Sequence, residues 1–148
     1  MKEYNIYLIN DSLKTTRCVE TAFFNSERAA KKRGEQLVEI EEALHHGRTS
    51  FHFVIREVED NIIARSKVGN YDYNIIIRYT EGKDKPFAVE REYPDVKRLR
   101  DVIDNFSTLP SALKCFERIT GRKFTAAFKA SFYLAFCKLQ GLIEKSKT

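Results

Sequence analysis

Residues 4–24, YNIYLINDSLKTTRCVETAFF, contain two strand-forming runs separated by a turn, a pattern that recurs later in the chain. Residues 4–9 are rich in strand-forming side chains and end at the turn-forming triplet Asn10-Asp11-Ser12. Residues 15–24 form a second run of the same kind. The two runs predict an antiparallel hairpin.

A helix is predicted directly after this hairpin, over residues 27–45. The side-chain oxygens of Asn25 and Ser26 can accept the unpaired backbone N–H groups of a helix start. Apolar residues then recur at helical spacing, and Gly47 suits the stop. Arg33 interrupts the apolar stripe. We expect its methylene groups to lie on the core with the guanidinium at the surface; the alternative is a buried pair with a carboxylate, or stacking on a Phe or Tyr ring.

Residues 71–106 appear in a similar order. Residues 71–80 and 86–93 predict a second hairpin, and Pro94 suits the first position of a helix. That helix would have an apolar stripe of Val96, Leu99, Ile103 and Phe106. Tyr-Asn-Ile occurs at residues 4–6 and 73–75, and Val-Glu at residues 19–20 and 89–90. These matches indicate an internal duplication over residues 4–45 and 73–106; independent convergence of two hairpins is the alternative.

A third hairpin is predicted between these two units. Residues 50–59 alternate apolar and polar side chains, as a half-buried strand does. Asp60 and Asn61 tolerate positive φ and predict a two-residue turn into a partner strand at residues 62–68. The predicted fold class is therefore α+β, with an antiparallel sheet of up to six strands built from two strand-strand-helix units. We expect both unit helices on one face of this sheet domain, residues 1–106.

Residues 107–148 predict a C-terminal helical pair packed on the same domain. A short helix begins at residues 109–111 and ends at Gly121, and a second covers about residues 125–145. The pair loosely resembles a helix-turn-helix. A recognition helix presents polar side chains to base edges, whereas this one presents phenylalanine, so we do not expect sequence-specific reading of DNA.

A row of phenylalanines marks the last helix. Phe124, Phe128, Phe132 and Phe136 are spaced by four, so the rings wind around the helix axis. The apolar arc is wider than the stripe of about 100° on an ordinary surface helix. Either this helix is central to the core, or part of the arc is a contact surface. We expect Phe128 and Phe132 in the core and assign a protein interface to Phe124, Phe136 and Tyr133.

The net charge of +5 is concentrated at one end of the chain. Residues 1–106 have 18 basic and 19 acidic residues, whereas residues 107–148 have 8 basic and 2 acidic. A localised excess favours an anionic partner. Basic residues also gather near the start of both unit helices. This arrangement suits phosphate binding at the helix starts; the alternative is that these side chains are exposed and their interaction with the helix dipole is screened by solvent. The candidate anion- or nucleic-acid-binding residues are Arg28, Lys31, Lys32, Lys97, Arg98, Arg100, Arg122, Lys123 and Lys129.

Catalytic and metal signatures are weak. His45, His52 and Arg48 are the candidates for a histidine-dependent nuclease, although a histidine at a helix end is also explained by the helix dipole. His45 and His46 lack the i, i+4 spacing that directs two imidazoles at one metal ion. The six glycines are scattered, so no phosphate-binding loop is formed. We expect no metal, no cofactor and no chemistry of the protein's own.

Cysteine usage and hydropathy indicate a compartment. Cys18, Cys115 and Cys137 are odd in number and form no CxxC pair, which argues against a disulfide scaffold and a thiolate zinc site. We expect reduced thiols, with Cys115 and Cys137 buried. The apolar run near the N-terminus is too short for a signal peptide, and no uncharged stretch reaches the length of a membrane span. A cytoplasmic protein is expected.

These observations predict a small non-enzymatic binding or regulatory protein. It would dock on a protein partner or an assembly through its basic, aromatic C-terminal helices, and a second copy of the chain is another possible partner. The first alternative is salt-sensitive binding to nucleic-acid backbone with little sequence specificity. The second alternative is the nuclease. Hydrophobic docking survives moderate salt, whereas backbone binding weakens steeply.

Overall fold

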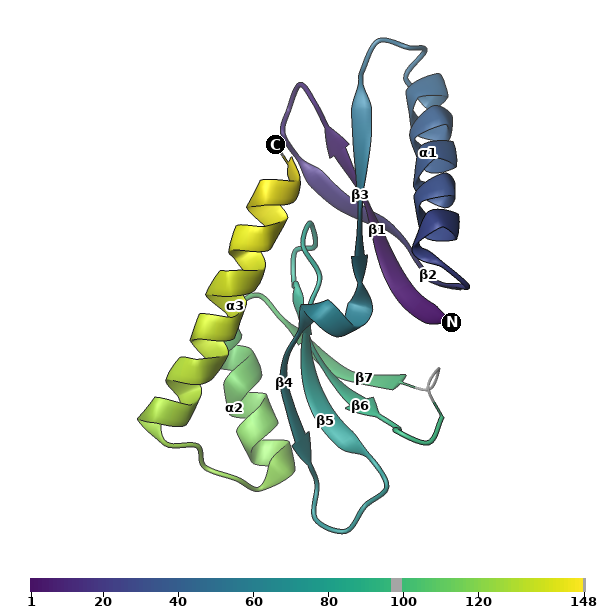
Figure 1. Cartoon of the computed structure of the whole chain (residues 1–148). Coiled ribbons are helices and arrows are strands. Elements are labelled where there is room, and N and C mark those ends of the chain that lie inside the picture. The colour runs from purple at the N-terminus through teal and green to yellow at the C-terminus, as the bar shows by residue number, and fades with distance from the viewer. Residues whose placement is uncertain (97–99, 148) are drawn as a thin grey trace. The chain divides into compact units, whose positions relative to one another are not determined.

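A computed structural model describes residues 1–96 and 100–147 (Figure 1). The chain divides into two compact units. Unit 1 consists of Met1–Asp60, Glu81–Lys83 and Ile143–Thr148, and unit 2 of Asn61–Thr80 and Asp84–Leu142. The described residues form two antiparallel sheets, of three and four strands, with three α-helices. The α+β class and the C-terminal helical pair are confirmed, with the strands divided between two sheets.

Unit 1 contains the predicted first hairpin. Strands β1 (Lys2–Asn10) and β2 (Thr16–Phe24) pair antiparallel, with an irregularity between Ile6 and Tyr7. Strand β3 (Phe51–Glu57) pairs with the other side of β1, giving the order β2-β1-β3. As the central strand, β1 is buried continuously from Tyr4 to Ile9. This explains why its apolar run is nearly unbroken.

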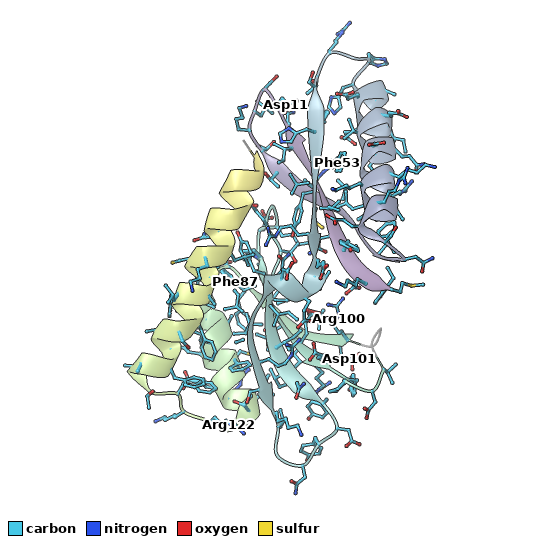
Figure 2. The ribbon with its side chains drawn as sticks, viewed as in Figure 1. Asp11, Phe53, Phe87, Arg100, Asp101 and Arg122 are labelled. Carbon is cyan, nitrogen blue, oxygen red and sulfur yellow. The ribbon has the colours of Figure 1, made fainter. Side chains whose placement is uncertain are left out.

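Helix α1 (Glu27–Leu44) follows β2 as predicted. The Ser26 hydroxyl accepts a hydrogen bond from the backbone N–H of Ala29, and so caps the helix start. The helix packs on β3 and β1, where Gly34 lies so close to Phe53 that a β-carbon would overlap the ring (Figure 2). Arg33 donates to Glu20 of β2, Nε to Oε2 at 3.0 Å, and both side chains are partly exposed, so a carboxylate pair forms but is not buried.

Unit 2 contains an antiparallel meander. Its strands are β4 (Ile62–Lys67), β5 (Asn74–Tyr79), β6 (Phe87–Glu92) and β7 (Arg100–Phe106), in the order β4-β5-β6-β7. The predicted hairpin of β5 and β6 is confirmed.

The prediction of a helix after Pro94 is wrong, because residues 100–106 form strand β7 against β6. Leu99 lies outside the described residues. The register slips between Val89 and Glu90, so Ile103 has no partner opposite it. A bulge of this kind lets Ile103 and Phe106, three residues apart, both pack on the core. A spacing of three is also typical of a helix, which explains the wrong prediction. Because a strand follows β6 where a helix was predicted, the strand-strand-helix order is not repeated in residues 73–106.

The predicted hairpin of residues 50–59 with 62–68 is also wrong. Both segments form strands, but β3 pairs with β1, whereas β4 pairs with β5. Asp60 and Asn61 belong to a short 3-10 helix, η1 (Val58–Asn61), in place of a two-residue turn. The chain thus passes from one sheet to the other at this point.

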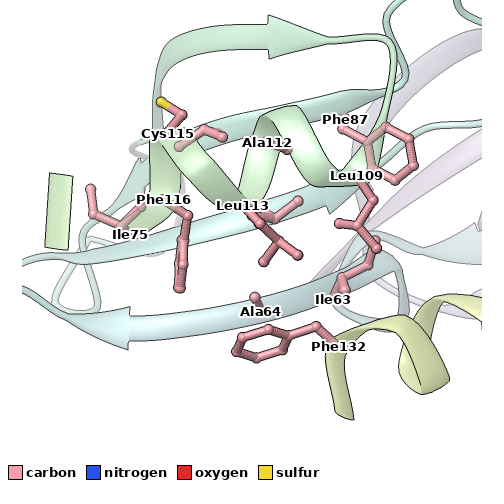
Figure 3. Packing of buried hydrophobic residues seen from close by; sticks show 12 residues of the cluster. Ile63, Ala64, Ile75, Phe87, Leu109, Ala112, Leu113, Cys115, Phe116 and Phe132 are labelled. Atoms are coloured by element: carbon pink, nitrogen blue, oxygen red, sulfur yellow. The ribbon is translucent and has the colours of Figure 1, made fainter. Parts of the chain in front are cut away.

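The core of unit 2 lies between its sheet and the C-terminal helices (Figure 3). Helix α2 (Leu109–Thr120) begins at the Thr108 cap, which accepts from the backbone N–H of Ser111, and ends at Gly121 with φ 68°. Its buried side chains pack on the β5–β6 face of the sheet. Helix α3 (Ala126–Lys147) adds Phe132 to the same core.

Candidate functional site

A hollow lies at the turn between α2 and α3 of unit 2; we call it the basic hollow because four of its six lining residues are cationic, although its exposed lining is mostly hydrocarbon. It has a volume of about 410 Å³. Its lining residues come from the last turns of α2 and the loop after it: Lys114, Glu117, Arg118, Gly121, Arg122 and Lys123. Figure 2 labels Arg122 in that loop. The left-handed conformation of Gly121 ends α2 and brings the loop cations beside the helix cations.

The single carboxylate of this hollow is already engaged. Glu117 accepts from Lys129 Nζ at 3.1 Å and from the backbone N–H of Phe124 at 3.3 Å. The hydrogen bond from Lys129 in particular holds the pKa of the Glu117 carboxyl below its usual value. Within the described residues, Lys114, Arg122 and Lys123 make no ion pair, and Arg118 contacts only the Cys115 sulfur, at 3.8 Å. In the described part of the chain none of the four thus makes a short ion pair, although Lys123 lies near enough to Glu117 for its charge to lower the pKa of that carboxyl.

A column of stacked rings starts in the core and ends at the surface beside this turn. Phe116 of α2 stacks on Phe124, with 24° between the ring planes and 5.5 Å between centroids. Phe124 stacks on Phe128, with 9° and 5.3 Å. Phe116 is fully buried, whereas Phe128 is 54% exposed. The expectation that Phe128 belongs to the core is therefore wrong, and the one for Phe132, at 8%, is confirmed.

The predicted interface residues do not share one surface: Phe136 and Tyr133 lie on different sides of α3, and Phe124 precedes the helix. Phe124 is half-buried in the ring column, and half-buried Phe136 packs edge-on against Tyr79 and Phe87. Tyr133 is exposed on the side away from the core. Of the three, only Tyr133 is freely presented to a partner.

Helix α3 has a second apolar side, which we call the outward face. At 100° per residue it lies opposite the buried side, where Phe132 and Leu139 pack. All of its residues are exposed: Ala126, Ala130, Tyr133, Leu134 and Cys137. None is charged. This result also corrects the expectation that Cys137 is buried; Cys115 is buried as expected.

The other predicted anion-binding residues do not gather at the hollow. Arg28, Lys31 and Lys32 are exposed on α1 of unit 1, and Lys31 pairs with Glu27 at 3.6 Å. Arg100 is half-buried on β7, where its charge lowers the pKa of Glu92 together with the nearer Arg65. Lys97 and Arg98 lie outside the described residues. Arg122 and Lys123 line the hollow, and Lys129 adjoins it through Glu117.

The histidine candidates do not form an acid–base pair. His52 of β3 bonds through Nδ1 to Asp11, which Figure 2 labels near the end of β1. His45 contacts Glu41, Nε2 to Oε1 at 3.5 Å, and packs on the ring of Phe51. Because Phe51 and His52 are neighbours in a strand, they point to opposite faces of the sheet. His52 therefore lies across the sheet from His45. Exposed Arg48 meets His45 through its backbone, whose N–H donates to the His45 carbonyl oxygen at 3.0 Å.

Two kinds of feature are absent from the described part of the chain. Among residues 1–96 and 100–147, no group of three His, Cys, Asp or Glu side chains is placed to hold a metal ion. No helix of these residues is both long and apolar enough to cross a membrane.

Sequence reasoning missed two cations of the hollow, Lys114 and Arg118. They belong to the last turns of α2, and only the helical spacing of four could have placed them on one side. It also missed the exposure of Phe128. The spacing of four between the phenylalanines shows that their rings wind around the helix. It does not show which rings are covered, because that depends on how far α2 extends beside them.

Comparison of the chain with protein-family models, with curated proteins and with solved structures found no match. Its function is therefore inferred from its own surfaces.

Proposed function

We propose that the protein is a non-enzymatic binding module that docks an amphipathic helix of another protein on the outward face of α3. The single observation that carries the proposal is the exposure of Tyr133, Leu134 and Cys137 on an uncharged side of a helix whose other side is packed in the core. Exposed apolar patches of this kind commonly mark protein interaction sites.

The composition of the face favours a helix as the docked element. Ala126 and Ala130 lie one turn apart and are small enough to let a second helix approach closely. Tyr133 and Leu134 supply the larger side chains, and tyrosine is enriched among residues that contribute most to binding. A helix whose own apolar stripe faces these residues would bury the two stripes against each other.

Charge favours a foreign, acidic partner over a second copy of the chain. Residues 107–148 have 8 basic residues and only 2 acidic ones, and Lys138 is exposed beside the outward face. Two copies packed face to face would bring these like charges together, which is unfavourable. A partner helix with acidic residues flanking its apolar stripe would meet the basic rim with complementary charge.

The test is site-specific photo-crosslinking in extract of the native host. A photoreactive amino acid replaces Leu134 in one sample and Leu13 in the control; Leu13 is also exposed, at 71% against 57%, but lies on unit 1. We expect position 134 alone to give a discrete adduct, with the crosslink in an amphipathic helix flanked by acidic residues. An adduct between two copies of the chain, or equal adducts from both positions, would contradict the proposal.

A further inference from the structure

The basic hollow points to a second activity, separate from docking on the outward face. We infer that Lys114, Arg118, Arg122 and Lys123 bind the phosphates of a single-stranded nucleic acid, while the exposed ring of Phe128 stacks on one of its bases. This site uses the α2–α3 turn and the first turn of α3.

The hollow is suited to an anion because its own carboxylate is taken. Glu117 is bonded to Lys129 and to the backbone N–H of Phe124, and it also feels the charge of Lys123, so one negative charge faces five cations. The four remaining cations line a space of about 410 Å³. Two are arginines, whose planar guanidinium groups match phosphate oxygens with two parallel hydrogen bonds. An anion with several charges would relieve the repulsion among the four.

The ring column selects a planar group beside these cations. Phe128 is the outermost of three stacked rings, and its plane lies 9° from that of Phe124. With 54% of its surface exposed, it can accept a further flat ring. It is held at this turn because Phe124 beneath it donates its backbone N–H to Glu117, a residue that lines the hollow. A cationic groove next to an exposed aromatic ring is the arrangement that binds single strands.

Single strands are favoured over two other anionic chains. In a duplex the bases are already stacked on each other, so none is free for Phe128. An acidic peptide would satisfy the cations but offers no regular planar group to the ring. Strand binding would depend steeply on salt, because each phosphate neutralised releases counterions.

The test is fluorescence anisotropy with the full chain and three labelled probes. They are an oligothymidylate of about twelve nucleotides, within the usual site size, the matching duplex, and a polyglutamate peptide of similar charge. We expect the single strand to bind most tightly, with affinity falling by orders of magnitude between about 50 and 200 mM salt. Tighter binding of the duplex or of polyglutamate would overturn the inference.

Matched variants locate the site. Arg118→Gln with Arg122→Gln should reduce the slope of log affinity against log salt by about 1 to 1.5, as expected for two lost phosphate contacts. Lys14→Gln with Lys83→Gln removes the same charge from exposed positions of unit 1 and should leave the slope unchanged. Phe128→Ala should weaken strand binding about tenfold, the usual size of one lost stack. Equal losses from both charge pairs, or no loss in Phe128→Ala, would overturn the inference.

Discussion

The ring of Phe128 lies nearly parallel to the ring of Phe124, with 9° between the planes and 5.3 Å between the centroids. One turn further along α3, Phe132 meets Phe128 almost edge-on, at 83°. Yet Phe132 is 8% exposed and Phe128 is 54% exposed. The border between core and surface thus falls between two phenylalanines four residues apart, although the sequence presents them as equal members of one row.

This border predicts unequal effects on stability. Phe132→Ala should lower the free energy of unfolding by about 3–5 kcal/mol, because it leaves a cavity against Phe116 and Phe124. Phe128→Ala removes an exposed ring and should cost only about 0.5–1.5 kcal/mol, the value of a ring pair. Urea denaturation of both variants checks this, and equal losses would show that Phe128 belongs to the core after all.

Two helical glycines should respond in opposite directions to the same substitution. At Gly34 a β-carbon would overlap the Phe53 ring, so Gly34→Ala should destabilise the protein by about 1–3 kcal/mol. At Gly141 nothing lies within 4 Å, so Gly141→Ala should stabilise the protein by up to about 1 kcal/mol, through helix propensity alone. Thermal unfolding measures both. Equal shifts would mean that α1 does not need the close approach to β3.

Burial separates two arginine–glutamate pairs. Arg78 Nε lies 2.6 Å from Glu90 Oε1, with the side chains 13% and 2% exposed, whereas Arg33 and Glu20 are 37% and 27% exposed. Glu90→Gln should lower the free energy of unfolding by about 3–5 kcal/mol, because a buried guanidinium loses its counter-charge. Glu20→Gln should lower it by less than about 1 kcal/mol, since water screens that pair. Chemical denaturation is the measurement, and comparable losses would refute the distinction.

Glu92 should make stability depend on acid. Burial raises the pKa of its carboxyl, but hydrogen bonds from Arg65 and Asn74 outweigh burial and hold the pKa below 4.5. A carboxyl with a lowered folded-state pKa stabilises the protein fully above its unfolded-state pKa, and this contribution is lost as the pH falls. The free energy of unfolding should therefore decrease below about pH 4.5. The decrease should be shallower in Glu92→Gln than in wild type, whereas the control Glu39→Gln, exposed on α1, should keep the wild-type slope.

Local chemistry in the sequence predicts the elements that are specified locally. The Ser26 cap, the left-handed stop at Gly121 and the hairpins of β1 with β2 and β5 with β6 all follow from neighbouring residues. The pairing of strands cannot be predicted from neighbouring residues in this way. A strand with alternating apolar and polar side chains, such as β3, can pair with any sheet edge that has its apolar side on the same face. The helix predicted after Pro94 was wrong for a physical reason. The bulge in β7 places Ile103 and Phe106 on the core side at the three-residue spacing that is typical of a helix.

The candidate surfaces were predictable only in part. The local excess of positive charge indicated the C-terminal helices, and the wide apolar arc indicated that α3 has more than one apolar side. Which rings are covered depends on α2 and the sheet, whose placement requires long-range contacts. The sequence analysis therefore singled out Phe136, which packs on Tyr79 and Phe87, and did not single out Leu134, which is exposed.

The most direct test of the docking proposal is the affinity of the partner crosslinked at position 134, measured by calorimetry with wild type, Leu134→Glu and Leu13→Glu. Both leucines are exposed, at 57% and 71%, so neither variant should shift the melting temperature appreciably. We predict that Leu134→Glu weakens binding at least about tenfold, because it places a charge within a buried apolar contact. Leu13→Glu should bind as wild type does. Wild-type affinity in Leu134→Glu, or an equal loss in Leu13→Glu, would contradict the proposal that the outward face of α3 is the docking surface.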